Sequence, residues 1–476
     1  MTSARTLDQL LGMGGATVVT GVANDSRRVS AGNLFLACAG DVDDGHRHVE
    51  EAVSRGAAAV CSERPVAACV PNVVMSDLRV RQGEIAARYF GDPSAALTCI
   101  GVTGTNGKTS VAYQCASLLD DTAYMGTIGW GDIARLSRSK LTTEDAVTVQ
   151  RRLGAMRGGG HTRVAMEVSS HALEQNRVAA VRFDIAVLTN LTRDHLDYHG
   201  TMERYAAAKR RLFEMPSLGT VVLNLDDPFG RGVAAEVEAR TIGYGLSPNA
   251  AVSWSEPGFH PHGITGRWHT PWGDSRFWLP LHGEFSLYNA AATLSVVCLA
   301  GKPFDDAVAQ MRCMMPVPGR MQRVASPNCS GPVVFIDYAH TPAALSAALA
   351  AVRQHLRGRL ICVFGCGGNR DPGKRPMMAM AVEEGADSAI VTSDNPRTEN
   401  PESIISDIVA GFTSPGFYTV EPNRTAAVRM AVERAGAGDV VLIAGKGHED
   451  FQDLGNERIP HSDLRFAQAA LDGRRV

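Results

Sequence analysis

Short apolar runs alternate with turn clusters and helix-like segments along most of this chain. In its first part the apolar runs cover 16–19, 34–38, 57–61 and 72–75, and the part closes on the turn cluster Gly91-Asp92-Pro93-Ser94. Runs of this length between turn-forming residues are typical of the strands of a small α/β domain. We therefore predict a first domain over residues 1–95.

A second series of apolar runs has the spacing of βαβ units. It opens just before Gly104, continues at 163–168, 183–188 and 220–225, and contains helix-like segments such as 111–119. This alternation predicts a mainly parallel sheet. The stretch 250–281 is rich in Trp, His, Pro and Gly with partial alternation, which predicts antiparallel strands at the margin of that sheet. The central domain is expected over residues 96–326.

The pattern restarts after Pro316-Val317-Pro318-Gly319-Arg320. Apolar runs at 333–336, 360–364, 388–391 and 440–443 are separated by helical stretches. A third, doubly wound and Rossmann-like domain over residues 327–476 accounts for them. The fold class predicted for the whole chain is therefore α/β with three domains.

The composition limits the kinds of binding partner and cellular location to be expected. The 476 residues are 45% hydrophobic and 20% charged, and 47 Lys and Arg balance 50 Asp and Glu. This balance argues against partners held by overall charge, such as nucleic acid or an anionic membrane surface. The chain has no signal-like start and no apolar run near the ~20 residues of a membrane span, and its ten cysteines contain no C-x-x-C pair. We expect a cytoplasmic protein with reduced thiols and no membrane insertion, and nothing implies an oligomer.

The Gly-rich turn between 103 and 110 carries the clearest chemistry. Glycines there let backbone N–H groups approach phosphate oxygens, a lysine can bridge the outer phosphates, and a threonine hydroxyl can ligate Mg²⁺. A strict phosphate loop would have glycine at Val102, so an ordinary strand-to-helix turn stays an alternative, although Lys108 followed by Thr109 argues against it. The predicted loop residues are Gly104, Thr105, Asn106, Gly107, Lys108 and Thr109.

Polar residues also follow two later predicted strands. Glu167 to His171 come after one strand, and Asn190 to His195 come after the next. Ligands bind at the carboxyl ends of strands in open α/β sheets. We therefore expect these segments to belong to the same site as the phosphate loop.

Seven segments together resemble the Mur ligases, in particular the branch that adds the third residue of the peptidoglycan stem peptide. The resemblance covers almost the entire chain and rests on 104–109, 167–171, 194–199, 207–209, 337–342, 394–397 and 445–449. It implies a small uridine-binding domain, a central P-loop ATPase and a carboxyl-terminal domain for the incoming amino acid. It also implies three small-molecule substrates: ATP, UDP-MurNAc-L-Ala-D-Glu and meso-diaminopimelate.

In the reaction that the resemblance implies, a carboxylate first reacts with a phosphate of ATP, and an amine reacts in a second step. The terminal carboxylate of UDP-MurNAc-L-Ala-D-Glu attacks the γ-phosphate of ATP, and the amine displaces phosphate from the acyl phosphate. Cations must neutralise the phosphates, and the acyl phosphate must be shielded from water. Mg²⁺ is the expected cofactor beside ATP.

The resemblance assigns the catalytic and metal-binding roles. It gives one Mg²⁺ to Thr109 and Glu167, and a second to His195 and to Lys209 carbamylated as N6-carboxylysine. The residues alone favour blander interpretations, namely a structural His195 and a solvated Lys209 on a basic helix face. The expected catalytic residues are Lys108, Glu167, His195 and Lys209.

The resemblance also supplies the residues that contact the two nucleotide substrates. For ATP, beyond the loop, they are Asn289, Arg320, Asp337 and His340. For the muramyl substrate they are Ser26, Thr142, Thr143, Ser169, Gln175 and Arg177. Glu144 departs from the family's pattern, because it adds an acid next to an anionic substrate.

The prediction of specificity for the incoming amino acid rests on Arg397. Its guanidinium can pair with the distal carboxylate that meso-diaminopimelate has and lysine lacks. The residues implied for this substrate are Arg370, Asp394, Asn395, Pro396, Arg397, Gly445 and Glu449. The alternatives are an L-lysine-adding ligase of the same family, a folylpolyglutamate-type ligase and a nucleotide-operated ATPase switch.

Overall fold

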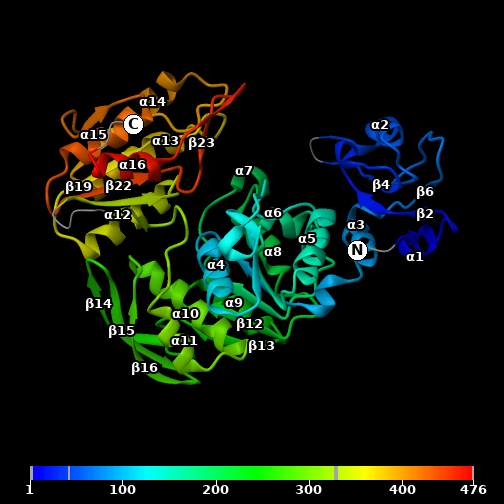
Figure 1. Cartoon of the computed structure of the whole chain (residues 1–476). Helices are drawn as coiled ribbons and strands as arrows, with labels where there is room; N and C mark the ends of the chain where they lie inside the picture. The colour runs from blue at the N-terminus through cyan, green and yellow to red at the C-terminus, as the bar shows by residue number, and fades with distance from the viewer. Residues whose placement is uncertain (1–3, 41–42, 326–330, 474–476) are drawn as a thin grey trace. The chain divides into compact units, whose positions relative to one another are not determined.

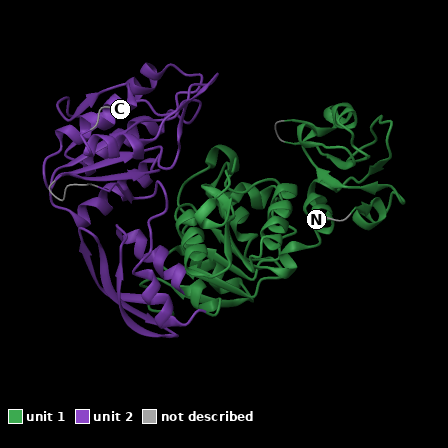
Figure 2. Cartoon of the chain, viewed as in Figure 1, with its two compact units in different colours: residues 1–251, 295–301 green, residues 252–294, 302–476 purple. Residues whose placement is uncertain are grey.

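The computed structural model describes residues 4–40, 43–325 and 331–473, shown along the chain in Figure 1. They divide into two compact units, 1–251 with 295–301 and 252–294 with 302–476 (Figure 2). The expected boundary between 326 and 327 lies outside the described residues, and the three domain ranges stay a prediction. The α/β class itself is confirmed, because each of the three regions contains a largely parallel sheet.

The first region holds a four-stranded parallel sheet. Its order is β3 (Gly21–Ala23), β4 (Asn33–Ala37), β5 (Ala59–Ser62) and β6 (Asn72–Val74). Helices α1 (Leu7–Leu11) and α3 (Leu78–Phe90) pack in one core, and α2 (Val49–Ser54) packs in a second. A short antiparallel pair joins β1 (Arg5–Thr6) and β2 (Val18–Val19).

A seven-stranded sheet forms the centre of the first unit. Its order is β13 (Arg240–Tyr244), β12 (Thr220–Asn224), β11 (Ile185–Leu188), β7 (Thr98–Thr103), β10 (Arg163–Glu167), β8 (Thr122–Gly126) and β9 (Gly129–Gly131). All neighbouring pairs are parallel except β8 and β9. After β7 the chain forms the strands that lie on the β10 side of β7, and it later continues at β11, which pairs with the opposite edge of β7. The end of β7 is therefore a topological switch point.

Helices connect these strands and carry several of the expected site residues. They are α4 (Lys108–Leu118), α5 (Ala146–Gly158), α6 (Ser170–Glu174), α7 (Leu196–His199), α8 (Met202–Arg210) and α9 (Pro228–Glu236). Most apolar residues of the strands are buried, as expected for strands covered on both faces.

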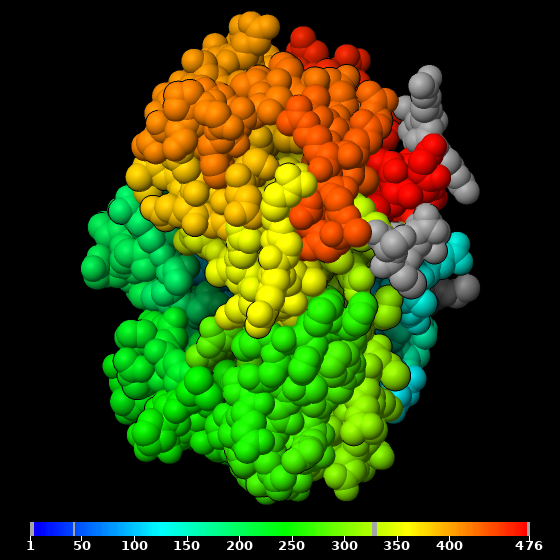
Figure 3. Space-filling model, turned by 90° about the vertical axis from the view of Figure 1, so that its left-hand side faces the viewer, coloured from blue at the N-terminus to red at the C-terminus, as the bar shows by residue number. Residues whose placement is uncertain are grey.

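The stretch 250–281 forms a sheet of its own. Strands β14 (Ser253–His260), β15 (Gly263–Thr270) and β16 (Gly273–Leu279) are antiparallel and pair with none of the central strands. The prediction of a margin position was therefore wrong. Polar residues alternate with buried aromatic ones along these strands, and one face of the sheet lies at the surface in Figure 3. Helices α10 (Glu284–Leu299) and α11 (Phe304–Met311) follow.

The last region has a six-stranded sheet. Its order is β17 (Gln322–Arg323), β18 (Val333–Asp337), β22 (Val440–Ala444), β19 (Leu360–Phe364), β20 (Ser388–Val391) and β21 (Tyr418–Val420), with only β17 antiparallel. One core takes α12 (Pro342–His355), α13 (Lys374–Gly385) and α14 (Pro401–Val409), and the other takes α15 (Arg424–Arg434) and α16 (Asp463–Leu471). A hairpin of β23 (Phe451–Asp453) and β24 (Arg458–Pro460) precedes α16.

Within the described part of the chain, we find no helix that is both long enough and apolar enough to cross a membrane.

Candidate active site

The loop between β7 and α4 is the geometric centre of the candidate site. Gly104 has a φ of 145°, and a Cβ atom placed there would lie 1.9 Å from Thr189 Oγ1. Only glycine therefore fits this close approach. Lys108 Nζ donates hydrogen bonds to the carbonyl oxygens of Gly104 and Thr105, both at 2.8 Å. The lysine thus lies over the loop, as a phosphate-binding interpretation requires.

Glu167 ends β10, the strand next to β7, and its carboxylate is held by several donors. Thr109 Oγ1 donates to Oε2 at 2.9 Å. Tyr124 OH and Thr127 N donate to Oε1 at 2.5 and 2.8 Å. Because Glu167 is 1% exposed, these bonds compensate for the loss of water around its charge.

Sequence analysis did not identify Tyr124 and Thr127. Tyr124 lies within β8, which pairs with β10, and Thr127 follows the end of β8. The usable signal was the position of polar groups at the carboxyl end of an apolar run. It was weak, because the strand order that places this run beside Glu167 cannot be read from local pattern.

Lys209 on α8 points at the same loop and is only 1% exposed. Its Nζ atom donates to the Gly104 carbonyl oxygen at 2.8 Å and lies 4.6 Å from the centre of the Tyr205 ring. Burial, together with the nearby charge of Lys108, lowers the pKa of this amine well below its usual range. A neutral amine is the form that reacts with carbon dioxide, so the environment suits a carbamate.

His195 lies between β11 and α7 in a left-handed backbone conformation, with a φ of 52°. Its ring centre is 4.9 Å from that of His171. Burial lowers the pKa of His195, and it lowers the pKa of His171 to about 4. Both rings are therefore neutral at physiological pH, which leaves a nitrogen lone pair available for a metal.

The side chains beside the loop supply only some of the oxygen ligands that a hard divalent cation needs. Thr109 and Glu167 offer two oxygen atoms 2.9 Å apart, which are the ligand type that Mg²⁺ prefers. Among the described residues, no group of three or more His, Cys, Asp and Glu side chains forms a ready metal site. A carbamate on Lys209 would add oxygen ligands beside this loop.

Several residues expected for the muramyl substrate form one hydrogen-bonded group beside Glu167. Thr143 Oγ1 donates to the Glu167 carbonyl oxygen at 2.8 Å and accepts from Ser169 N at 3.1 Å. Arg177 donates to the Thr143 carbonyl oxygen at 2.8 Å and to Gln175 Oε1. Thr142 Oγ1 lies 3.1 Å from Thr127 Oγ1.

Glu144, the residue that departs from the family's pattern, is buried and paired. Its carboxylate accepts from Arg152 at 2.8 Å and from Lys140 N at 2.9 Å. The acid is thus neutralised within its own loop, which removes the conflict with an anionic substrate.

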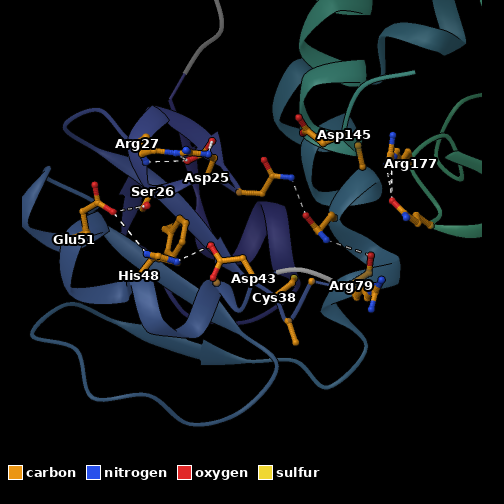
Figure 4. A pocket seen from close by; sticks show the side chains of 18 residues that line it. Asp25, Ser26, Arg27, Cys38, Asp43, His48, Glu51, Arg79, Asp145 and Arg177 are labelled. Atoms are coloured by element: carbon orange, nitrogen blue, oxygen red, sulfur yellow. Dashed lines mark hydrogen bonds and ion pairs between the residues drawn. The ribbon is translucent and has the colours of Figure 1, made fainter. Parts of the chain in front are cut away.

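A cavity of about 420 Å³ brings Ser26 together with Gln175 and Arg177 (Figure 4). Ser26 is buried and donates to Glu51 Oε2 at 2.6 Å. The wall combines cations and hydroxyl groups with carboxylates, and it also includes Arg27, Asp43 and Arg79. Thr142, Thr143 and Ser169 do not line this cavity, so the cavity unites only half of the predicted set.

The second unit holds the remaining residues expected for ATP. Asp337 ends β18, and its carboxylate accepts from Met321 N and Ala339 N, both at 2.7 Å, while burial raises its pKa. The Arg320 guanidinium lies 4.4 Å from the centre of the Tyr338 ring. His340 follows β18 with Nδ1 2.9 Å from the Tyr338 carbonyl oxygen, and Asn289 is on α10.

The residues expected for the amino acid follow β19, β20 and β22, which are adjacent in the six-stranded sheet. Asn395 Nδ2 donates to Glu449 Oε2 at 2.8 Å. Arg397 has a φ of 52°, and its Nη1 donates to the Gly368 carbonyl oxygen at 2.6 Å. A Cβ atom at Gly445 would lie 2.5 Å from Asp394 Oδ2, so these two loops are in close contact. Pro396 lies between Asn395 and Arg397, and Arg370 is exposed on the loop after β19.

Family models and individual relatives match nearly the whole chain. The models are described as "Mur ligase family, catalytic domain" for residues 18–90, "Mur ligase middle domain" for 102–297 and "Mur ligase, glutamate ligase domain" for 319–447. A UDP-N-acetylmuramoyl-L-alanyl-D-glutamate--2,6-diaminopimelate ligase of Coxiella burnetii is 44% identical over 470 residues, covering 95% of this chain and 96% of the relative. The ligase of the same name from Alkalilimnicola ehrlichii is 46% identical, covering 95% of both chains. The chain belongs to the Mur ligase family.

A solved structure supports the same assignment for the fold of this Mur ligase. The structure of a UDP-N-acetylmuramoyl-L-alanyl-D-glutamate--2,6-diaminopimelate ligase is 35% identical, covers 99% of both chains and has a TM-score of 0.73. The expectation of a Mur ligase, drawn from seven short segments, is thereby confirmed.

Proposed function

We propose that this Mur ligase adds meso-diaminopimelate to UDP-MurNAc-L-Ala-D-Glu in the cytoplasm, with cleavage of ATP to ADP and phosphate. The observation that carries the proposal is the convergence of Lys108, Thr109, Glu167 and Lys209 around one glycine-rich loop. These groups supply the cations and oxygen ligands that phosphoryl transfer to a carboxylate needs. The names of the full-length relatives support the choice of substrates.

In this proposal the loop binds the ATP phosphates through its backbone N–H groups, and Lys108 turns from the loop carbonyls toward the outer phosphate oxygens. Thr109 and Glu167 would hold one Mg²⁺, and His195 with carbamylated Lys209 would hold a second. Bound Mg²⁺ would neutralise charge on the phosphates and so ease attack by an anionic nucleophile. Asn289, Arg320, Asp337 and His340 are proposed as further ATP-binding residues.

Ser26, Gln175 and Arg177 in the cavity, with Thr142, Thr143 and Ser169, are proposed to bind the UDP-muramyl dipeptide. Arg177 suits a carboxylate of this substrate, because guanidinium forms directed, charge-assisted hydrogen bonds. The dipeptide's terminal carboxylate attacks the γ-phosphorus, and ADP leaves. The diaminopimelate amine then attacks the acyl carbon and displaces inorganic phosphate, and the amine proton passes to solvent or a nearby base.

Arg397 is proposed as the residue that selects diaminopimelate over lysine. Its guanidinium can pair with the distal carboxylate of diaminopimelate, with Arg370 available for a second carboxylate. Lysine has the same number of ammonium groups but lacks the distal carboxylate, so it would leave the Arg397 guanidinium without an anionic partner. We expect this mismatch to favour diaminopimelate on the order of 10³-fold. Asp394, Asn395, Pro396, Gly445 and Glu449 complete the proposed amino-acid site.

The deciding experiment measures phosphate release by the purified protein with ATP, Mg²⁺ and UDP-MurNAc-L-Ala-D-Glu. Parallel reactions contain meso-diaminopimelate, L-lysine or no amino acid. Release that requires diaminopimelate supports both the ligase and the role of Arg397. A preference for lysine keeps the ligase and overturns that role, whereas release indifferent to both favours a nucleotide-operated switch.

A further inference from the structure

Lys446 is a buried cation that the proposed mechanism does not yet use. It follows β22 and is 0% exposed. Its Nζ atom donates to Asn395 Oδ1 at 2.9 Å and to Glu449 Oε2 at 2.8 Å, and it lies 5.6 Å from the centre of the Phe451 ring. Because burial of an unpaired ammonium group is strongly unfavourable, these two acceptors explain how the site tolerates this lysine.

The contact with Lys446 determines which way the Asn395 amide faces. Asn395 Oδ1 accepts from Lys446 Nζ and also from Asp453 N at 2.9 Å. An ammonium group and a backbone N–H are donors only, so the carbonyl end of the amide must face them. The NH₂ end is therefore turned to Glu449, where it donates to Oε2 at 2.8 Å.

The same contacts orient the Glu449 carboxylate. Its Oε2 atom accepts from both Lys446 and Asn395, while the side chain keeps 20% of its surface exposed. Two short charge-assisted bonds on one oxygen restrict rotation of the carboxylate. The other oxygen, Oε1, is then presented in a set direction to an ammonium group of a substrate.

We propose that Lys446 is a positioning residue of the amino-acid site, which acts through Asn395 and Glu449 to orient the carboxylate for an ammonium group of the incoming diamino acid. The inference rests on the proposed function, because it takes Asn395 and Glu449 as substrate contacts. Lys446 itself is fully enclosed and does not touch the substrate. Its contribution is preorganisation, since a preset carboxylate loses less conformational freedom on binding.

The test compares Lys446→Met, which removes every donor, with Lys446→Gln, which keeps an amide donor but is neutral and one bond shorter. Lys302→Met serves as a matched control, because Lys302 Nζ donates to Gln310 away from these residues. For each full-length variant, KM for diaminopimelate, KM for ATP and kcat are measured. Lys446→Met should raise KM for diaminopimelate on the order of tenfold, with KM for ATP unchanged, and Lys446→Gln should raise it by a smaller factor.

A double-mutant cycle with Glu449→Gln separates positioning from a general structural effect. If Lys446 acts through Glu449, the double variant should bind diaminopimelate no more weakly than the weaker single variant. The proposal would be overturned if the two substitutions raised KM for diaminopimelate by independent factors that multiply in the double variant. It would also be overturned if KM for diaminopimelate and KM for ATP rose equally, or if all variants had unchanged kinetics. If Lys446→Met does not fold, Lys446→Gln and its cycle with Glu449→Gln decide the matter. Failure of the proposed function is distinguishable, because it would appear in the unmodified protein as phosphate release that does not need diaminopimelate.

Discussion

The Nζ atom of Lys209 lies 2.8 Å from the carbonyl oxygen of Gly104, so a buried lysine of α8 contacts the glycine-rich loop directly. We predict that Lys209→Met lowers kcat about 100-fold or more, because it removes the group that the proposed mechanism makes a metal-binding carbamate. Phosphate release in buffer depleted of carbon dioxide should also be slow and should recover when bicarbonate is added. Lys302→Met is the control, and full turnover by Lys209→Met would disprove the role.

Glu167 and its donor Tyr124 provide a graded test of the first metal site. Glu167→Gln should abolish most activity at any Mg²⁺ concentration, since a neutral amide is a poor ligand for this ion. Tyr124→Phe keeps the carboxylate but removes the 2.5 Å hydrogen bond that orients it. It should raise the Mg²⁺ concentration for half-maximal activity about tenfold. A Mg²⁺ titration measures both effects, and an unchanged titration curve for Tyr124→Phe would argue against orientation by this bond.

Arg397→Met should reduce kcat/KM for diaminopimelate on the order of 10³-fold, because a carboxylate of the substrate loses its charged partner. The value for L-lysine should change far less, so the ratio of the two is the informative quantity. Arg429→Met on the exposed surface of α15 is the control. Equal losses for both amino acids would point to a general defect of the loop instead.

Arg424 and Asp463 form an ion pair in which neither side chain is exposed, with a 2.7 Å contact between Nη2 and Oδ2. Arg424 also donates to the Ala444 carbonyl oxygen at 2.8 Å, at the end of β22. Arg424→Met should lower the free energy of unfolding by about 3–5 kcal/mol, because it leaves the buried Asp463 carboxylate without its guanidinium partner. Urea unfolding of this variant and of Arg429→Met measures the difference. A midpoint equal to that of the control would contradict the prediction.

His282 should make the stability of the second unit depend on pH. Burial lowers its pKa from 6.5 to about 4, so the folded protein keeps the ring neutral where the unfolded chain would protonate it. Stability is therefore complete above pH 6.5 and declines as the pH falls toward 4, by at most ~1.4 kcal/mol per pH unit from this group. Urea unfolding between neutral pH and about pH 5 should show a smaller decline for His282→Gln than for the unmodified protein. Identical declines would exclude His282 as a source.

Much of the secondary structure was readable from pattern. The apolar runs at 360–364 and 388–391 coincide with β19 and β20, because parallel strands buried on both faces are apolar throughout. The stretch 250–281 was read correctly as antiparallel strands but assigned to the wrong sheet. Alternation of polar and apolar residues along a strand indicates that one face is buried, but it does not indicate which strands pair with that strand.

Some candidate site residues could likewise be predicted from sequence motifs, whereas others depend on the tertiary structure. Motifs predicted the phosphate loop, Glu167 and Arg397 as site residues, whereas the residues alone described Lys209 as part of a solvated helix face. The structure buries it, because α8 places it against a loop 105 residues earlier in the chain. Sequence motifs likewise contained Lys446 without assigning it a role, and its partner Asn395 lies 51 residues away.

The sequence by itself determined the order of strands and helices, the chemical groups available and, through its motifs, the family. Only the tertiary structure decided which of those groups are buried, which pairs share hydrogen bonds and which amines and imidazoles have a lowered pKa. The physical reason is that periodicity and turn chemistry depend on neighbours along the chain. Burial and pKa depend instead on atoms brought close from distant segments.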